Sequence, residues 1–543
     1  MIRQALRTNV RRVQQAISKS LPAPTGGWNT RDPLANMKPE YAVILDNWIP
    51  RAGYVELRKG DRVWCNNAPA PVESLMVYRG DATGGDQVYA VSDGDIYDAT
   101  LIDTTFTSPV YTGLSNSRVQ YLNFANDGGA FLIGVNGEDT PFYWDNATWD
   151  TLTITGSSGS ITLDPDTLID LVMHKRRLFF VEKDSLHVWY LGTDAIQGDA
   201  KLLDLGPVFQ QGGIIASIGT WSLDGGQGQD DYLAIFSTQG EVAIYQGTDP
   251  DDDLVWSLVG VFVVGFPLGR RSLLKYGSDL LALTTNGVIP LSQALSLDRA
   301  KDETVAITAQ IQPTFQTSSQ AYFDNFGWCA ITYQQAALAL YNVPVEELTT
   351  SLQYVQNLQT GAWCSFSGLN AFCWDTTDES IFYGGLDAVY QWNVGVTDHG
   401  NDLECDLQTA FSTFGQSGRI KHFTMIQPVL NATANVRPAI EMLVDFEDRE
   451  PTSVPTTTIS DRTDVLEIRK DWTSVVGDGA WGAVRMQAIL SADPLLTSTL
   501  ADGDGNDIVD GDGNLIAIDS GEPVSAQIQC IGFNTLFEPG GVL

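Results

Sequence analysis

Between Val72 and Asn393 the chain repeats one pattern: an extended aromatic segment, a turn rich in Gly, Asp or Asn, and a second extended segment. Segments of this kind are 87–97, 130–144, 177–190, 232–245, 280–287 and 381–392. They start roughly 40 to 55 residues apart across much of this span, which is the spacing of β-propeller blades. Radial repetition also protects the edges of the sheets. The pattern therefore predicts an all-β fold that contains a β-propeller of about six blades.

The composition favours the same fold class. Gly (51), Trp (14), Tyr (18) and Phe (22) are plentiful, whereas Lys and Arg together number 31. Strands favour aromatic residues, and glycine is used mainly in turns. Residues 354–366 predict one more hairpin, with Trp363 as a core residue. At 543 residues the chain exceeds the size at which one core keeps growing, so two or three domains are expected.

The regions on either side of the repeats have a different character. We predict a basic N-terminal arm over 1–20, an N-terminal platform segment over 21–71, the propeller over 72–398 and a C-terminal β-rich platform segment over 399–543. If the N-terminal segment pairs with the C-terminal part, the propeller is an insertion in, or is joined to, a platform domain built from both ends of the chain.

The first 20 residues have the spacing of an amphipathic helix. Their apolar residues Ile2, Leu6, Val10, Val13 and Ile17 recur every three or four positions. The same segment has no acidic residue and five basic ones, Arg3, Arg7, Arg11, Arg12 and Lys19. Three interpretations remain open: a helix that docks onto an acidic neighbouring protein, a helix on a membrane surface, or a frayed terminus.

A second motif is the sequence DGDGN, which occurs twice between Asp502 and Asn514. Carboxylates alternating with glycines can surround a calcium ion, because the acids supply oxygens and the glycines permit tight turns. The candidate ligands are Asp502, Asp504, Asn506, Asp507, Asp510 and Asp512. The spacing does not fit an EF-hand, since Asp507 stands where Gly is required and Gly513 where Glu is required. Asp-Gly is also a preferred hairpin turn, so a solvated, turn-rich loop without a metal is the alternative.

Motifs of common enzymes are absent from the sequence. It has no GxSxG elbow, phosphate-binding GxxxxGK[ST] loop, HExxH helix or GxGxxG after a strand. Asp170 and His174 are four residues apart, a spacing more typical of a surface pair on a helix than of a catalytic dyad. The sequence therefore predicts a protein that is not an enzyme and has no cofactor other than the calcium considered above.

The six cysteines are Cys65, Cys329, Cys364, Cys373, Cys405 and Cys530. They show no CxxC pair, so buried thiols in a reducing cytoplasm are expected rather than a metal site or a disulfide framework. The N-terminus lacks the continuous apolar core of a signal peptide, and no apolar run is long enough to cross a bilayer. Stable membrane anchoring is not expected.

Two stretches resemble a known family. Residues 26–60 contain GGWNTRDP, then DNWIP, then GYVELRKG, and the chain ends with FEPGGVL at 537–543. Both are similar to segments of the tail nozzle, or tail tubular protein B-like, proteins of short-tailed bacteriophages. The resemblance implies a structural virion protein of the tail that assembles in the host cytoplasm as a homo-oligomeric ring, a hexamer. It further implies an adaptor protein above the ring, tail fibres or spikes attached to it, and double-stranded DNA that is retained and then passes through during ejection.

The charge fits such a role. The formal net charge is −36, and beyond residue 20 the remaining 26 basic and 67 acidic residues give −41. A body of this charge repels nucleic-acid phosphate. It is either a soluble acidic surface or the wall of a conduit that DNA passes without tight binding. The candidates to line such a channel are the acids of two loops, Asp224, Asp230, Asp231, Asp249, Asp251, Asp252 and Asp253.

Two other functions compete with the nozzle. One is a carbohydrate-binding or glycan-degrading propeller, and the other is a tail hub or plug of another phage lineage. Glycan cleavage requires paired carboxylates in one pocket, and the composition alone cannot exclude such a pocket. The sialidase-type pattern S-x-D-x-G-x-x-W is absent from the sequence.

Overall fold

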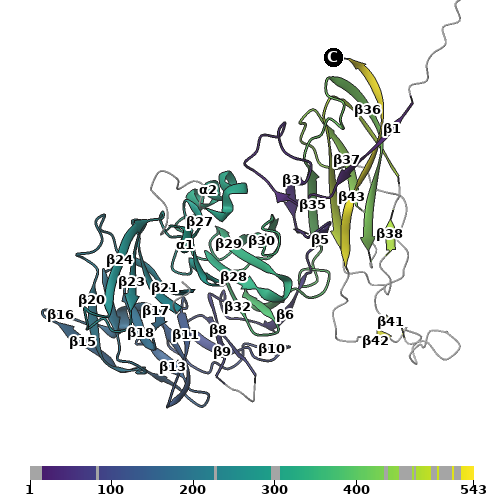
Figure 1. Cartoon of the computed structure of the whole chain (residues 1–543). Coiled ribbons are helices and arrows are strands. Elements are labelled where there is room, and N and C mark those ends of the chain that lie inside the picture. Colours follow the sequence, from purple (N-terminus) through teal and green to yellow (C-terminus); the bar gives the residue numbers. More distant parts are fainter. Residues whose placement is uncertain are drawn as a thin grey trace, which may run out of the picture. The chain divides into compact units, whose positions relative to one another are not determined.

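The computed structural model of the chain is shown in Figure 1. It describes residues 15–80, 85–224, 229–294, 306–432, 438–451, 467–469, 472–490, 498–499, 517–518 and 527–542. The chain divides into two compact units. The larger comprises Arg58–Leu403 with Ser491–Ser525, and the smaller comprises Met1–Leu57, Glu404–Leu490 and Ala526–Leu543.

Within Arg58–Leu403 the larger unit contains seven sheets in succession along the described part of the chain, and most of their strand pairs are antiparallel. The first sheet consists of β7 (Ser74–Tyr78), β8 (Gln87–Ser92) and β9 (Asp95–Asp98). The second consists of β11 (Gln120–Asn126), β12 (Gly129–Val135), β13 (Phe142–Trp144) and β14 (Trp149–Thr151). The third consists of β17 (Leu168–His174), β18 (Arg177–Glu182), β19 (His187–Tyr190) and β20 (Gly198–Asp204), and it is extended by β15 (Ile154–Ser158) and β16 (Ile161–Thr162).

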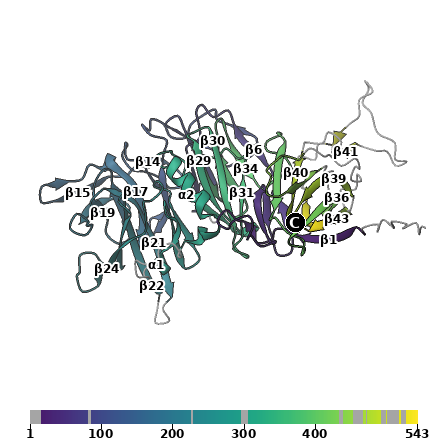
Figure 2. The same cartoon turned by 90° about the horizontal axis from the view of Figure 1, so that it is seen from above.

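The fourth sheet consists of β21 (Ile215–Asp224), β22 (Gln229–Ser237), β23 (Glu241–Gly247) and β24 (Trp256–Val263). The fifth consists of β25 (Leu273–Tyr276), β26 (Asp279–Thr284) and β27 (Gly287–Pro290). The sixth consists of β28 (Cys329–Tyr333), β29 (Leu338–Glu346), β30 (Thr350–Asn357) and β31 (Trp363–Phe366). Two short helices, α1 (Leu291–Ala294) and α2 (Gln312–Ala321), connect the fifth sheet to the sixth. Several strands of the third and fourth sheets are labelled in the second view (Figure 2).

The seventh sheet closes the ring. It consists of β32 (Cys373–Thr376), β33 (Ile381–Gly384) and β34 (Ala388–Trp392), and β34 pairs with β6 (Asp61–Asn66) from the start of the unit. The first strands of successive sheets lie next to one another in the order β7, β11, β17, β21, β25, β28 and β32, and β32 lies next to β7. Closure of a ring by its two chain ends gives a seven-bladed β-propeller.

The propeller predicted from the sequence is confirmed, but two details differ. Seven blades are present in the described residues rather than about six, because the hairpin at 354–366 belongs to a blade of its own. Trp363 in that hairpin is a core residue, as expected, with 1% of its surface exposed. The propeller also begins before residue 72, because β6 is a strand of the closing blade.

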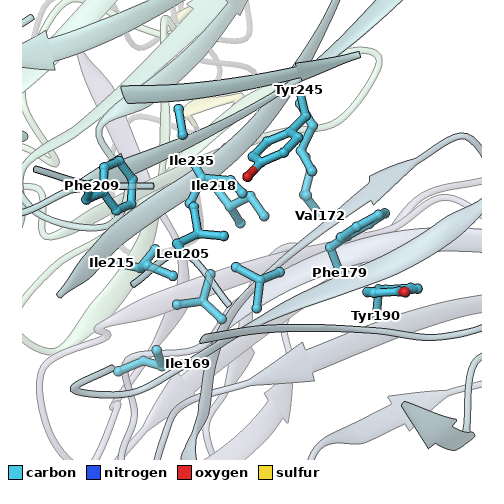
Figure 3. Close-up of a cluster of buried hydrophobic side chains, with 14 of the residues drawn as sticks. Ile169, Val172, Phe179, Tyr190, Leu205, Phe209, Ile215, Ile218, Ile235 and Tyr245 are labelled. Carbon is cyan, nitrogen blue, oxygen red and sulfur yellow. The ribbon is translucent and has the colours of Figure 1, made fainter. Parts of the chain in front are cut away.

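Aromatic and aliphatic side chains fill the spaces between blades. Between the third and fourth blades, Phe179 and Val172 face Ile218, Ile235 and Tyr245 (Figure 3). Phe179 is fully buried, and its ring stacks on Trp256 at 6.1 Å with an angle of 10° between the planes. This packing explains why the strands of the repeats are rich in aromatic residues: each blade buries both faces against its neighbours.

A buried polar network joins the two ends of the propeller. Arg58, the first residue of the unit, donates from Nη1 and Nη2 to the two carboxylate oxygens of Asp398 at 2.7 and 2.6 Å. Nearby, Asp61 accepts hydrogen bonds from His399 Nδ1 at 3.0 Å and from the Tyr383 hydroxyl. These contacts link positions more than 300 residues apart in sequence, so they hold the closing strand in place.

The His399 contact predicts a pH-dependent stability. The hydrogen bond that His399 donates to the Asp61 carboxylate raises the pKa of His399 above its ordinary value, although burial opposes the rise. Because the folded pKa is the higher one, the stabilisation is complete below the unfolded pKa of about 6.5 and is lost as the pH rises through the folded pKa. We expect the free energy of unfolding of the wild type, measured with urea, to fall as the pH rises from 6 to 8. In His399→Gln this fall should be smaller. The same pH dependence in both proteins would contradict this role of His399.

The smaller unit is built from both ends of the chain. One sheet has the order β38 (Glu467–Arg469), β36 (Arg419–Ala432), β43 (Ile528–Val542), β5 (Val55–Leu57) and β4 (Trp48–Pro50), with β1 (Ile17–Pro22) paired to β43 and β39 (Thr473–Gly479) paired to β36. The other strands run in the order β3 (Tyr41–Asp46), β35 (Leu403–Thr409), β40 (Gly482–Leu490) and β37 (Ala439–Val444), with β2 (Gly27–Trp28) beside β3.

The pairing of the N-terminal and C-terminal segments makes the propeller an insertion. Cys530 of β43 pairs with Val55 of β5, and Phe537 of β43 pairs with Ile17 of β1. The rings of Phe414, Phe423 and Phe537 pack together in the core of this unit, with centroids 5.4 to 5.7 Å apart. The expectation of a platform built from both ends of the chain is therefore confirmed.

The helix predicted over 1–20 is wrong in its last residues. Residues 17–20 belong to strand β1, and the backbone partners offered by β43 outweigh the helical spacing of the apolar side chains. Lys19 is exposed on this strand. Arg3, Arg7, Arg11 and Arg12 lie outside the described residues, and so do all the calcium-ligand candidates between Asp502 and Asp512.

All six cysteines are buried, as the sequence predicts. Among the residues that the structure covers, no helix is both long enough and apolar enough to span a membrane.

Candidate functional site

A cavity of about 330 Å³ lies at one end of the propeller ring, and we call it the central pocket. Its walls come from the segments just before the inner strands β11, β25 and β28, from the start of β17, and from the turns after β12 and β18. It is lined by Asn116, Arg118, Gln120, Asn136, Ile169, Lys183, Gly269, Arg270, Arg271, Phe323, Asp324, Asn325, Phe326, Gly327 and Trp328. Inner-strand ends converge at such a position, so side chains from several blades meet there.

The central pocket is basic in a chain that is strongly acidic. Four of its lining residues are Arg or Lys, and Asp324 is the one acid among them. Lys183 is paired with Glu138 outside the lining. The three arginines differ in how many hydrogen bonds they form with the rest of the protein. This difference decides which of them could bind a ligand.

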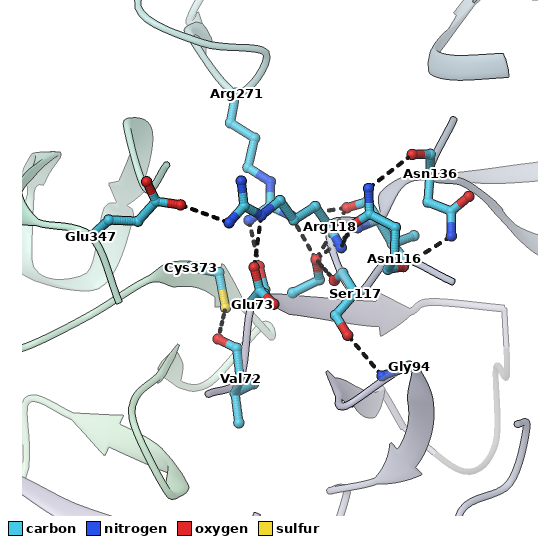
Figure 4. Close-up of polar contacts among 12 residues, drawn as sticks. Val72, Glu73, Gly94, Asn116, Ser117, Arg118, Asn136, Arg271, Glu347 and Cys373 are labelled. Carbon is cyan, nitrogen blue, oxygen red and sulfur yellow. Dashed lines mark hydrogen bonds and ion pairs between the residues drawn. The ribbon is translucent and has the colours of Figure 1, made fainter. Parts of the chain in front are cut away.

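Arg271 crosses the ring. From the fifth blade its guanidinium donates to the Glu73 carbonyl at 2.9 Å, to Ser74 Oγ at 2.6 Å and to the Val119 carbonyl at 3.0 Å, which belong to the first and second blades (Figure 4). These bonds use donors of both Nη1 and Nη2. Arg271 therefore crosses the centre of the ring at this end and joins opposite blades.

Arg118 is held by two carboxylates. Its Nε donates to Glu73 at 2.7 Å and its Nη2 donates to Glu347 at 2.7 Å (Figure 4). Its guanidinium lies 4.1 Å from the centre of the Phe326 ring, a cation–π contact. Burial acts to lower the pKa of Arg118, but the two carboxylates raise it overall. This side chain shapes the wall of the pocket and remains charged.

Arg270 stands in contrast to both. Its Nη1 is buried without a hydrogen-bond partner, and no described residue forms a hydrogen bond or an ion pair with its guanidinium. Burial lowers the pKa of Arg270, and the charges of Asp170 and Asp184 oppose that effect. A cation without a partner in a partly buried position is costly unless something supplies an anion.

Asp170 lies beneath the pocket on strand β17. Its two carboxylate oxygens accept hydrogen bonds from the backbone N–H groups of Leu171 at 2.9 Å and Ile218 at 3.2 Å. Burial raises the pKa of Asp170 to about 7, although the charge of Arg270 opposes the rise. The carboxylate is thus held by two backbone N–H groups and forms no ion pair with Arg270 among the described residues.

The interpretation of Asp170 and His174 as a surface pair on a helix is wrong. Both side chains are buried on strand β17, where His174 Nε2 lies 3.1 Å from the Gly247 carbonyl oxygen. The alternation of buried positions in the inner strand determines their placement, and the four-residue spacing has no helical meaning here.

The acids predicted to line a channel lie away from the central pocket. In the hairpin between β21 and β22, Asp224 pairs with Gln229 and Asp230 pairs with Leu223, at the far end of β21 from the ring end that holds the pocket. The loop 249–253 connects β23 to β24 at the same far end, where Gly247 contacts His174.

Several of these acids are committed to ion pairs. Asp231 pairs with Lys175 at 2.5 Å, Asp249 with Arg177 at 3.1 Å, and Asp251 with Lys201 at 2.5 Å. Asp251 also accepts a hydrogen bond from Tyr190 at 2.8 Å. Asp252 and Asp253 are exposed and form no ion pair within the described residues. Of the loop 249–253, those two are the acids whose charge no described basic residue neutralises.

The sequence analysis missed the central pocket. A signal was present in the Arg270–Arg271 pair, since two adjacent arginines are unusual in a chain with 31 basic residues and a net charge of −36. Their convergence with Arg118 depends on the ring, which places residues about 150 positions apart at one end of the propeller. No group of His, Cys, Asp and Glu in the described ranges could hold a metal ion.

Comparisons with known proteins give no family. No family model and no curated protein matches the chain. Solved structures that are similar include BBS1N in complex with ARL6DN, at 13% identity over 42% of this chain and 71% of that one, with a TM-score of 0.29. YCF48 from Cyanidioschyzon merolae shares 11% identity over 63% of this chain and 99% of that one, with a TM-score of 0.32.

A quinonprotein alcohol dehydrogenase-like protein from Bacteroides thetaiotaomicron VPI-5482 is also similar, at 12% identity over 59% of this chain and 68% of that one, with a TM-score of 0.31. At these values the similarities carry no argument about function. The description of the propeller rests on its own strand order and ring closure.

Proposed function

We propose that this chain is a structural virion protein, a tail nozzle subunit of a short-tailed bacteriophage that forms a ring around the DNA channel and catalyses nothing. The observation that carries the proposal is that the two segments that resemble nozzle proteins contribute strands to one sheet. Residues 48–57 supply β4 and β5, residues 537–542 end β43, and β43 pairs with β5 through Gln529 and Cys530. Segments from opposite ends of the chain thus form one platform, as expected if both belong to one assembly unit.

In this proposal DNA passes through the ring of subunits and not through a propeller. The propeller's own channel is crossed by Arg271, whose donors reach the first and second blades. The propeller instead offers an acidic outer body, and the platform is the part suited to contacts with neighbouring copies, the adaptor and fibres or spikes.

The test of the proposal is the assembly state of the purified full-length protein. We expect native mass spectrometry and electron microscopy to show a closed ring, with six copies as the resemblance implies, and a central channel. The ring should not bind duplex DNA tightly at physiological salt, because an acidic wall repels phosphate. A protein that stays monomeric both alone and with the portal–adaptor assembly of its phage would contradict the proposal, as would tight, saturable DNA binding.

The channel-wall role makes a narrower prediction for Asp252 and Asp253. Changing both to lysine alters the charge by four units per subunit while sparing Asp249 and Asp251, which are held in ion pairs. Duplex DNA carries about one charge per 1.7 Å of its axis, so basic side chains facing the lumen would bind it repeatedly. We expect slower genome ejection from particles that carry the variant, with ring assembly unchanged.

The matched control is the double change to asparagine at the same two positions. It removes the negative charges without adding positive ones, so ejection should be slowed much less than by the lysines. Normal ejection by the lysine variant would remove this loop from the lumen.

A further inference from the structure

Three polar groups of the central pocket are not committed to hydrogen bonds or ion pairs with described residues. Arg270 Nη1 is buried without a hydrogen-bond partner. The side-chain amide of Gln120 is half-buried, and the carboxylate of Asp324 is exposed. Arg118, Arg271 and Lys183, by contrast, are all bonded to other parts of the propeller. The pocket therefore separates into a fixed frame and a set of unused groups that face a cavity.

Arg270 requires an anion. Its Nη1 is buried, and its planar guanidinium can donate two parallel hydrogen bonds to a carboxylate. The charges of Arg118, Arg271 and Lys183 around the same cavity add to the positive potential. In a chain of net charge −36, such a local excess of positive charge is specific to this place.

The other two unused groups indicate hydroxyls. An amide both donates and accepts hydrogen bonds, and an ionised carboxylate accepts them, so Gln120 and Asp324 together suit the hydroxyl groups of a sugar. A bare oxyanion could accept from the Gln120 amide N–H but could not donate to the amide oxygen, and it would be repelled by Asp324. The ligand must therefore carry an anionic group at one end and hydroxyl groups elsewhere.

An aromatic wall completes the cavity. Phe323, Phe326 and Trp328 lie in the segment before β28, and Phe323 is 40% exposed although it is a large apolar side chain. Aromatic rings pack on the apolar face of a sugar ring, and a volume of about 330 Å³ lies at the small-molecule end of ligand pockets.

We propose that the central pocket binds an acidic sugar of the uronic acid class. The sugar's carboxylate pairs with Arg270, its hydroxyls bond to Gln120 and Asp324, and the apolar face of its ring packs on Phe323. Binding involves no bond cleavage, because Asp324 is the one carboxylate in the lining and glycoside hydrolysis uses two. This site goes beyond the structural role of the chain and does not depend on ring formation.

The test measures binding of glucuronate, glucose and inorganic phosphate to the full-length protein by ligand-observed NMR and calorimetry. We expect glucuronate to bind the wild type more tightly than glucose or phosphate. Arg270→Met should weaken glucuronate binding by about tenfold or more, the equivalent of losing a charge-assisted hydrogen bond. Because Arg270 has no partner in the protein, this variant should keep the melting temperature of the wild type or exceed it.

The matched control is Arg176→Met. Arg176 is exposed and paired with Asp194 in the turn after β17, at the opposite end of that strand from the pocket. Like Arg270→Met, the Arg176→Met variant removes one positive charge, but it should leave glucuronate binding unaltered. A second variant, Phe323→Ala, should weaken glucuronate while phosphate is unaffected.

Several outcomes would overturn the inference. Undiminished glucuronate binding by Arg270→Met would remove the ligand from this pocket, and equal binding of phosphate and glucuronate would rule out a sugar site. No binding of glucuronate by the folded wild type would dismiss the site altogether. Ring formation by Arg270→Met is measured separately, so failure here is distinguishable from failure of the nozzle proposal.

Discussion

Replacing Arg58 by methionine should lower the free energy of unfolding by about 3–5 kcal/mol, the usual cost of removing one partner of a buried ion pair. The Arg58 side chain has no exposed surface, and the Asp398 side chain is 7% exposed. Methionine fills much of the same volume but cannot donate a hydrogen bond. The Asp398 carboxylate would then be a buried charge without its partner.

The surroundings of this ion pair leave little room for adjustment. Arg58 also donates to the Ser367 carbonyl at 2.8 Å, and Gly368 follows with φ of +91°. A Cβ on Gly368 would lie 2.7 Å from Asp398 Oδ2, so the backbone is packed directly against the pair. Because Arg58 and Asp398 stand near the two ends of the inserted propeller, the loss should affect closure of the whole ring.

Urea unfolding followed by tryptophan fluorescence measures the effect. Arg176→Met is the control, since Arg176 forms an exposed ion pair whose loss should be close to neutral. Combining Arg58→Met with Asp398→Leu should recover much of the lost stability, because an apolar pair of similar volume can replace a buried ion pair. A loss below about 1 kcal/mol for the single variant, outside the range usual for such pairs, would show that the pair does not hold the ring ends together.

The sequence carried enough information for the blades and too little for their closure. Each hairpin recognised from the sequence corresponds to strands of one blade, for example 177–190 to β18 and β19. Hairpins are local, so alternating apolar residues and turn glycines are sufficient to predict them. The pairing of β6 with β34 joins residues more than 300 positions apart, and no local pattern encodes it.

The same distinction explains what could be predicted of the candidate sites. The acidic residues at 249–253 are easily recognised in the sequence as a cluster. Asp251, however, contacts Lys201 and Tyr190, which lie about 50 to 60 residues away in sequence, so the sequence alone does not reveal these contacts. Arg270 is inconspicuous in sequence and becomes notable only because the ring leaves it without a partner. The function of a charged side chain here depends on whether the fold gives it a partner, and amino-acid composition carries no information about such pairing.

Replacing Arg271 by methionine should cost about 2–4 kcal/mol of stability, because buried acceptors that lose their donor retain their desolvation cost. Three acceptors are affected: the carbonyls of Glu73 and Val119 and the hydroxyl oxygen of Ser74. Ser74 Oγ still donates to the Ser117 carbonyl at 2.7 Å and accepts from the Val119 N–H at 2.9 Å. The two carbonyls lose a charged donor, and the inner strands of opposite blades lose the side chain that joins them across the ring.

Arg271→Lys should restore only a small part of this stability. A lysine ammonium is a point charge with a different reach, and it cannot reproduce the planar fork that meets three acceptors on two blades. Lys275→Met, on the exposed side of β25 in the same blade, is the control and should be close to neutral.

The measurement is urea unfolding together with hydrogen exchange of the inner strands β7 and β11. Faster exchange in both strands of the Arg271→Met variant would show that one side chain couples the fifth blade to the first and second. If the variant unfolds at the urea concentration of the wild type and its inner strands stay protected, the seven blades are held by inter-blade packing alone. Arg271 would then occupy the centre of the ring without stabilising it.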